Sequence, residues 1–152
     1  MQLLELTLGM KKNLMKNTHK IVWITGASSG IGAEVAKIYS RRGIKLILSS
    51  RNVAALEQVK YKCYYPENVK ILPIDLNDFY AAPALVKKAY NIFGRIDILI
   101  NNAGVSQRSL IVDTQLDVFK KLIEINYLGT VALSRALLPF FLKQGFGHYV
   151  VV

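Results

Sequence analysis

The sequence predicts an α/β fold built on a doubly wound parallel sheet. Two observations carry this prediction: short apolar runs recur from Lys20 onward, and segments with apolar residues at helical spacing separate them. Strands that are apolar on both faces and joined through helices are typical of parallel sheets with right-handed crossovers. The 152 residues, 52% of them hydrophobic and 20% charged, suit one folded core.

The expected strands and helices follow one another in order. Residues 20–25 (KIVWIT), 44–50, 69–75, 97–103 and the terminal 148–152 read as strands. The first helix carries Ile31, Val35, Ile38 and Tyr39 at helical spacing, and further helices are expected near 52–64 and 81–93, with Pro83 in the first turn of the latter.

A long amphipathic helical region is predicted over residues 115–142, and Pro139 is expected to end or kink it. Its predicted stripe consists of Leu116, Phe119, Leu122, Ile123, Asn126, Tyr127 and Thr130. Residues 1–18 read as an N-terminal tail or weak surface helix. We expect no transmembrane helix, because no stretch of about 18 uncharged apolar residues exists.

The formal charge of +10 favours an anionic partner: nucleic acid, an acidic membrane surface or a phosphorylated ligand. No zinc-finger spacing, aromatic RNA-binding motif or dense basic run accompanies the charge, so nucleic acid is disfavoured. Cys63 is the single cysteine, which excludes an internal disulfide and fits a reducing compartment. His19 and His148 lack metal-ligand spacing, so no metal site is expected.

The glycine-rich stretch TGASSGIG, residues 25–32, predicts a phosphate-binding turn between the first strand and helix. Gly26 would allow the sharp turn, Gly30 the approach of backbone to a diphosphate, and Gly32 the close packing of helix and sheet. The helix N-terminus would present free N–H groups and a positive dipole end. The spacing G-x-x-x-G-x-G departs from the standard dinucleotide pattern, and a tight turn without ligand is the alternative.

Three later motifs fall where the same ligand would need them. Arg51, followed by Asn52, ends the second strand, where a guanidinium would pair with a ribose 2′-phosphate; a solvated surface arginine is the alternative. Asp75, followed by Leu76, could accept the adenine amino group or cap the next helix. The NNAG stretch, residues 101–104, could support the cofactor or form a structural turn.

In order and spacing these motifs resemble the short-chain dehydrogenase/reductase family over about residues 18–152, here as the N-terminal portion of such a protein. The resemblance implies a Rossmann-like domain over residues 19–152, incomplete at the C-terminus, and a nicotinamide cofactor, with NADP(H) favoured over NAD(H) because of Arg51. The implied cofactor-binding residues are Thr25, Gly26, Ser28, Ser29, Gly30, Ile31, Gly32, Arg51, Asn52, Asp75, Leu76, Asn102, Ala103 and Gly104.

The resemblance further implies hydride transfer to or from a carbonyl or alcohol of a lipophilic substrate, such as a steroid or retinoid. Asn126 corresponds to the catalytic-tetrad asparagine that interrupts a helix and holds a water; a buried helix asparagine satisfied by local backbone is the alternative. The implied location is intracellular, cytoplasmic or at the endoplasmic-reticulum membrane, with homo-oligomers of the full-length enzyme and membrane association only through a segment absent here.

The catalytic motif of that family is missing from this sequence. None of the eight tyrosines is followed four residues later by the lysine that would lower its pKa, and no serine follows the fifth strand. We therefore expect a fragment cut within strand five, inactive alone, with an exposed and aggregation-prone edge. The alternatives are a non-catalytic dinucleotide-binding module or truncated isoform, and a basic nucleic-acid binder with salt-dependent affinity.

Overall fold

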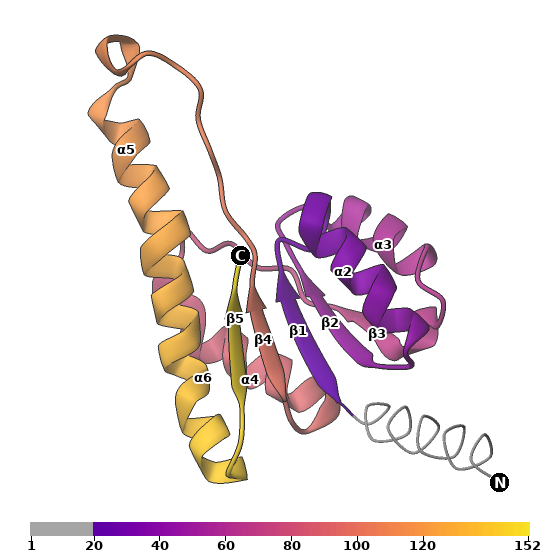
Figure 1. The fold of residues 1–152 in the computed structure, drawn as a ribbon. Helices are drawn as coiled ribbons and strands as arrows, with labels where there is room; N and C mark the ends of the chain where they lie inside the picture. Colours follow the sequence, from indigo (N-terminus) through magenta and orange to yellow (C-terminus); the bar gives the residue numbers. More distant parts are fainter. Residues whose placement is uncertain (1–19) are drawn as a thin grey trace, which may run out of the picture.

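The computed structural model describes residues 20–152 as a five-stranded parallel sheet with helices on both faces (Figure 1). The strand order is β3-β2-β1-β4-β5, so the chain winds outward from β1 in one direction and then crosses back to continue from β4 in the other. The predicted doubly wound α/β architecture is therefore confirmed. The tail assigned to residues 1–18 lies outside the described residues.

The elements from β1 to β3 form one half of the sheet. They are β1 (Ile21–Thr25), α2 (Gly30–Arg41), β2 (Lys45–Ser49), α3 (Val53–Tyr61), the short η1 (Pro66–Asn68) and β3 (Val69–Ile71). The predicted strand at 69–75 is shorter than expected, although Leu72 N and Ile74 N still donate to the carbonyls of Leu48 and Ser50 beyond its end.

The second half begins with η2 and ends with β5. Its elements are η2 (Phe79–Ala81), α4 (Ala82–Phe93), β4 (Ile98–Asn101), η3 (Ile111–Asp113), α5 (Leu116–Ile123), the π-helix η4 (Glu124–Gly129), α6 (Thr130–Gln144) and β5 (His148–Val151). Pro83 lies in the first turn of α4, as predicted. β5 pairs only with β4 in the described residues, and Val151 and Val152 are exposed, so the expected free edge is present.

The alternation of β1 side chains builds two cores, one on each face of the sheet. Val22 and Ile24 pack with residues of α2 and α3, whereas Trp23 packs with α4 and α6. All five residues of β1 are buried, which is the pattern of a central strand covered on both sides. This rigid centre fixes where the loops after each strand emerge.

The predicted apolar stripe of α2 is right in part, because Val35 and Tyr39 pack against the core while the other two residues do not. Ile31 and Ile38 are exposed by 61% and 49%, and the buried residues are Gly32, Ala33, Ala36 and Ser40. Small side chains bring the helix close to the sheet, where a Cβ on Gly32 would lie 2.6 Å from the Gly26 carbonyl oxygen. Bulky branched residues do not fit this contact and therefore point outward.

The helical region around residues 115–142 forms as predicted, but α5 has no buried residue, and only η4 and α6 contribute to the core. Leu116, Ile123 and Tyr127 of the predicted stripe are exposed, and the buried residues are Ile125, Gly129, Leu133, Leu137 and Phe141. Pro139 does not end the helix, which continues to Gln144. Because Pro139 is itself exposed, the carbonyl left without a partner by its missing N–H can face water.

The helical stretch Leu116–Gln144 is also long and apolar enough to cross a membrane, with a mean hydropathy of 1.3 over its most apolar window. Only its length and composition indicate a membrane span. Leu133, Leu137 and Phe141 belong to the core on the α4 side of the sheet, so this stretch serves as a covering helix of the domain.

Candidate functional site

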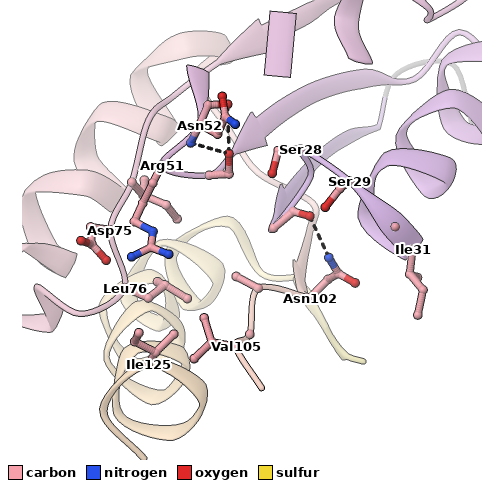
Figure 2. A pocket seen from close by; sticks show the side chains of 16 residues that line it. Ser28, Ser29, Ile31, Arg51, Asn52, Asp75, Leu76, Asn102, Val105 and Ile125 are labelled. Carbon is pink, nitrogen blue, oxygen red and sulfur yellow. Dashed lines mark hydrogen bonds between the residues drawn. The ribbon is translucent and has the colours of Figure 1, made fainter. Parts of the chain in front are cut away.

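A cavity of about 690 Å³ opens at the carboxyl ends of the strands (Figure 2). It lies where the winding direction reverses between β1 and β4, the position at which open α/β sheets bind ligands. Its lining comes from the segments that follow β1, β2, β3 and β4, with one residue from η4: Gly26, Ser28, Ser29, Gly30, Ile31, Ser50, Arg51, Asn52, Ile74, Asp75, Leu76, Asn102, Ala103, Gly104, Val105 and Ile125.

The glycine turn forms one wall of the cavity. Gly26 has a φ of +64°, and a Cβ there would lie 2.7 Å from the Ala103 Cα, so only glycine fits this crossing of two backbones. Gly30 has a φ of +55°, yet nothing lies within 4 Å of the position its Cβ would take. Gly26 therefore makes the turn, whereas the absence of a side chain at Gly30 leaves open space at the mouth of the cavity.

The N-terminus of α2 faces this mouth. Its N-cap residue Ser29 makes no side-chain capping hydrogen bond, and the first backbone bond of the helix runs from Ala33 N to Ser29 O at 3.3 Å. The amides of the first turn consequently have no acceptor within the helix, and the positive end of the helix dipole adds to their field. This arrangement is suited to an anionic group.

Thr25 and Asn102 hold the turn in place. The Thr25 hydroxyl donates to the Ile100 carbonyl at 3.2 Å and accepts from the N–H groups of Asn102 and Ala103 at 3.1 and 3.0 Å. The Asn102 side-chain amide donates to the carbonyls of Thr25 and Gly26 at 3.0 and 3.1 Å. Thr25 and Gly32, both predicted to bind cofactor, do not line the cavity and act as its frame.

Arg51 stands on the wall formed by the loop after β2. Asn52 accepts a hydrogen bond from Ala55 N at 3.0 Å and so caps α3, while Ser50 Oγ accepts from Asn52 N at 3.1 Å. These bonds fix the backbone on both sides of Arg51, whose guanidinium extends along the cavity wall in Figure 2. Within residues 20–152 it makes no ion pair, which leaves its donors available.

Asp75 closes its own turn by accepting a hydrogen bond from Asn77 N at 3.0 Å. The helix-cap alternative for Asp75 is wrong, because Asp78 fills that role by accepting from Ala81 N. The second carboxylate oxygen of Asp75 makes no hydrogen bond to the described residues. Asp75 and Leu76 both line the cavity beside Arg51.

Asn126 lies in the π-helix η4, which interrupts the helix as the resemblance implies. Its side-chain oxygen accepts from Val105 N and its amide nitrogen donates to Val105 O, both at 2.8 Å. The alternative of a buried asparagine satisfied by local backbone is wrong, because Asn126 is exposed and its partner lies 21 residues earlier. Asn126 does not itself line the cavity, but its neighbour Ile125 does.

The sequence reasoning missed four lining residues: Ser50, Ile74, Val105 and Ile125. Each adjoins a motif residue that was predicted, so including the immediate neighbours of every motif would have found them. Three of them, Ile74, Val105 and Ile125, are apolar, so they give the cavity a hydrophobic wall opposite the glycine turn.

Tyr149 and Cys63 lie outside the cavity. The Tyr149 hydroxyl donates to the Ser134 carbonyl at 2.8 Å, and burial raises its pKa, which is the opposite of what an acid–base tyrosine needs. Burial likewise raises the pKa of the Cys63 thiol, so this cysteine is a weak nucleophile. Among the residues with described positions, no group of three potential metal ligands exists.

Comparison with known proteins gives a consistent set of relatives. A family model described as short chain dehydrogenase matches residues 20–152. "Dehydrogenase/reductase SDR family member 7" of Homo sapiens is 50% identical over 140 residues, covering 89% of this chain and 41% of the relative, and its counterpart in Mus musculus is 47% identical with the same coverage. The chain thus spans about two-fifths of the length of these relatives. The similarity to member 7 thus extends over most of the chain.

Solved structures agree with the fold. A short-chain dehydrogenase from Streptomyces avermitilis has a TM-score of 0.80 at 30% identity and covers 88% of this chain and 48% of its own. An alcohol dehydrogenase from Thermococcus sibiricus, complexed with 5-hydroxy-NADP, has a TM-score of 0.78 at 29% identity over 88% of this chain and 57% of its own. A 3-ketoacyl-(acyl-carrier-protein) reductase from Brucella melitensis, complexed with NADH, has a TM-score of 0.75 at 29% identity. The match covers 83% of this chain and 51% of the reductase.

Proposed function

This chain belongs to the short-chain dehydrogenase family, and from that premise we propose that it is the cofactor-binding part of an NADP(H)-dependent oxidoreductase. The proposed reaction is hydride transfer to or from a carbonyl or alcohol of a small lipophilic molecule, steroid-like or retinoid-like. The observation that supports it best is the open mouth at Gly30, where a helix N-terminus, a glycine turn and a guanidinium meet in one cavity.

The residues present fit a dinucleotide. The first-turn amides of α2 and the open space at Gly30 suit a diphosphate, which would carry two negative charges to a positive dipole end. Ser28 and Ser29 add hydroxyls to the same wall. On the neighbouring wall, Asp75 has a carboxylate oxygen to accept the adenine amino group, and Leu76 offers an apolar surface for the adenine ring.

Arg51 supports the choice of NADP(H). Its guanidinium lines the cavity at the end of β2, where the family's cofactors carry the ribose, and it has no acidic partner in residues 20–152 that would compete with a 2′-phosphate. The solved relatives include one complexed with an NADP derivative and one with NADH, so relatives of this fold use either cofactor.

Bound in this cavity, the nicotinamide ring would supply the hydride acceptor or donor. The chain's own contribution would be to bind and orient it: Ala103 and Gly104 leave room beside the backbone after β4, and Asn126 fixes Val105 at the end of that segment. We propose that Asn126 also holds a water for proton exchange. The family's serine and Tyr-x-x-x-Lys pair are not in this sequence, so we expect the 152 residues to bind cofactor without turnover.

We further propose an intracellular location, in the cytoplasm or at the endoplasmic-reticulum membrane. The single cysteine, which is buried and free, supports this location. Homo-oligomerisation is proposed for the full-length enzyme only. The exposed apolar face of α5 and η4 supports this idea, since Leu116, Ile123 and Tyr127 are all exposed among the described residues.

The proposal is tested by a substitution that places a side chain in the open space beside Gly30. Gly30→Asn places a side chain in the open space at Gly30 while asparagine tolerates its positive φ, so NADPH binding followed by fluorescence should weaken by about 100-fold or more. Gly94→Asn is the matched control, because Gly94 also has a positive φ (+77°) and open space but caps α4 far from the cavity. Binding of NADPH to the Gly30 variant as tightly as to the Gly94 variant would contradict the proposal.

A further inference from the structure

Most of the positive charge of residues 20–152 lies away from the cofactor cavity. Arg51 is the only lysine or arginine among the residues that line it. Asp75 and Asp78, in the segment that follows β3, lie at that end of the sheet instead. Most of the lysines and arginines of residues 20–152 therefore lie elsewhere in the structure.

That location is the opposite end of the domain, where the parallel strands begin. We define the basic end as the exposed cations gathered there: Lys20, Arg41, Arg42, Lys45, Lys62 and Lys143. The backbone of Lys45 donates to Lys20 O at 3.1 Å, which brings the starts of β1 and β2 together. Arg41 and Arg42 end α2, Lys62 caps α3 and Lys143 is in the last turn of α6.

Few carboxylates balance these cations. Glu67 is exposed in η1 at the same end, and Asp97 is buried, where it accepts from Ile21 N and pairs with Arg95 at 2.6 Å. In the described part of the chain the ion pairs engage Lys37, Lys60, Arg95 and Lys120, and none includes a residue of the basic end. Helix dipoles explain Arg41 and Lys143, and Lys45 Nζ lies 5.3 Å from the centroid of the Phe93 ring, but Lys20 precedes a strand and has neither partner among the described residues.

Exposed aromatic rings border the same surface. Tyr64 and Tyr65 are exposed by 68% and 38%, and their rings meet edge to face with centroids 4.7 Å apart. Tyr65 N donates to Ser40 Oγ at 3.0 Å, so the two rings are anchored beside the C-terminal end of α2, next to Arg41. Exposed tyrosines beside lysine and arginine are typical of surfaces that meet lipid headgroups.

A hollow of about 570 Å³ opens at this end as well. Lys20, Arg95 and His148 contribute nitrogen groups to its lining, and Phe146, exposed by 48%, contributes an apolar wall. Arg95 lies over the Phe146 ring at 5.2 Å, which holds both side chains at the rim. Asp97 also lines the hollow, but its carboxylate is buried and paired with Arg95, which leaves the Lys20 ammonium and the apolar side for an acidic headgroup and its glycerol.

We propose that the basic end docks on the surface of an anionic phospholipid bilayer. Charge complementarity supplies the attraction, at about 1 kcal/mol for each lysine or arginine near such a surface, and the tyrosines supply the contact at headgroup depth. The cofactor cavity lies at the other end of the strands and faces away from the bilayer, so lipid and dinucleotide do not compete. The contact differs from an anchor in a segment outside the chain, because it uses folded residues.

The test is sedimentation of the 152-residue chain with vesicles of phosphatidylcholine, either pure or with about 30% phosphatidylserine, at about 0.1 M salt. We expect binding to the phosphatidylserine vesicles alone, and its loss at about 0.5 M salt, where the Debye length is short. A spin without vesicles removes any aggregate. Equal binding to both kinds of vesicle, or to neither, would overturn the proposal.

Two charge variants locate the contact. R41S/R42S/K62S removes three cations of the basic end and should weaken vesicle binding by at least about tenfold. K87S/K88S/K121S removes three exposed cations from α4 and α5, and it should bind within about twofold of the original chain. Circular dichroism confirms that both fold. Equal losses in the two variants would refute the location, and tighter binding of the chain to a DNA duplex than to the vesicles would refute the lipid partner.

Discussion

Asn126 and Val105 hold each other through both hydrogen-bonding groups of one side chain and one peptide unit. Asn126 Oδ1 accepts from Val105 N and Asn126 Nδ2 donates to Val105 O, each at 2.8 Å. The pair ties the loop after β4 to the π-helix η4, and Val105 itself and Ile125, the neighbour of Asn126, both line the cavity. The helix interruption and the cavity wall are therefore one mechanical unit.

Replacing Asn126 with aspartate should break this unit. Aspartate keeps the acceptor for Val105 N but sets a second oxygen against the Val105 carbonyl, so the free energy of unfolding should fall by about 1–3 kcal/mol in urea titration. Asn91→Asp is the control, since Asn91 is exposed on α4 with no such partner among the described residues. If the two variants lose equal stability, the paired bonds contribute nothing special.

Gly129→Ala should destabilise the protein although alanine is the better helix former. A Cβ on Gly129 would lie 2.6 Å from the Leu76 carbonyl oxygen and 2.8 Å from the Leu76 Cβ, so the cavity segment at Leu76 must shift. We expect a loss of about 1–3 kcal/mol in the free energy of unfolding. Helix propensity alone predicts a gain of about 1 kcal/mol, so a more stable variant would show that the helix and Leu76 are not in tight contact.

The stability of the domain should fall in alkaline solution, partly through Tyr149. Burial raises the pKa of Tyr149 above its ordinary value of 10.0, so above that pH the unfolded chain releases this proton before the folded chain does. Stability is therefore fully present below the ordinary value and is lost as pH rises toward the raised one. Cys63 acts in the same direction from its ordinary value of 9.0.

Tyr149→Phe checks this assignment. Phenylalanine loses the hydrogen bond to the Ser134 carbonyl, which lowers stability at neutral pH, but it has no proton to release. The decline in unfolding free energy above the ordinary pKa of 10.0 should be shallower in the variant than in the original chain. An identical decline in both would mean that the Tyr149 hydroxyl does not contribute to the alkaline loss.

The sequence predicted those features that depend on local pattern. Buried parallel strands are continuous apolar runs, so β1, β2 and β4 were recognised, and the glycine turn was recognised because positive φ and close backbone contact both require glycine. Arg51 and Asp75 were placed because each follows a strand directly. All of these signals lie within a few residues of the feature they indicate.

The features that were wrong or missed depend on contacts between distant segments. The packed face of α2 is made of Gly32, Ala33 and Ala36, whose small size permits close approach but registers weakly in an apolar pattern. The partner of Asn126 lies across the fold at Val105, and no local spacing indicates it. The apolar stripe at Leu116 and Ile123 was real in sequence, yet α5 has no buried residue, and α6 is the helix that packs against the sheet.

The most direct test of the account compares the dissociation constants of NADPH and NADH for the original chain and for Arg51→Ala. We predict tighter binding of NADPH to the original chain, and a loss of about 10- to 100-fold for NADPH in the variant, since a charge-assisted hydrogen bond contributes about 1.5–3 kcal/mol. NADH affinity should stay within about twofold, and Arg135→Ala, an exposed arginine on α6, should change neither. Equal affinities of the original chain for both cofactors, or an Arg51 variant that keeps its preference for NADPH, would contradict the account.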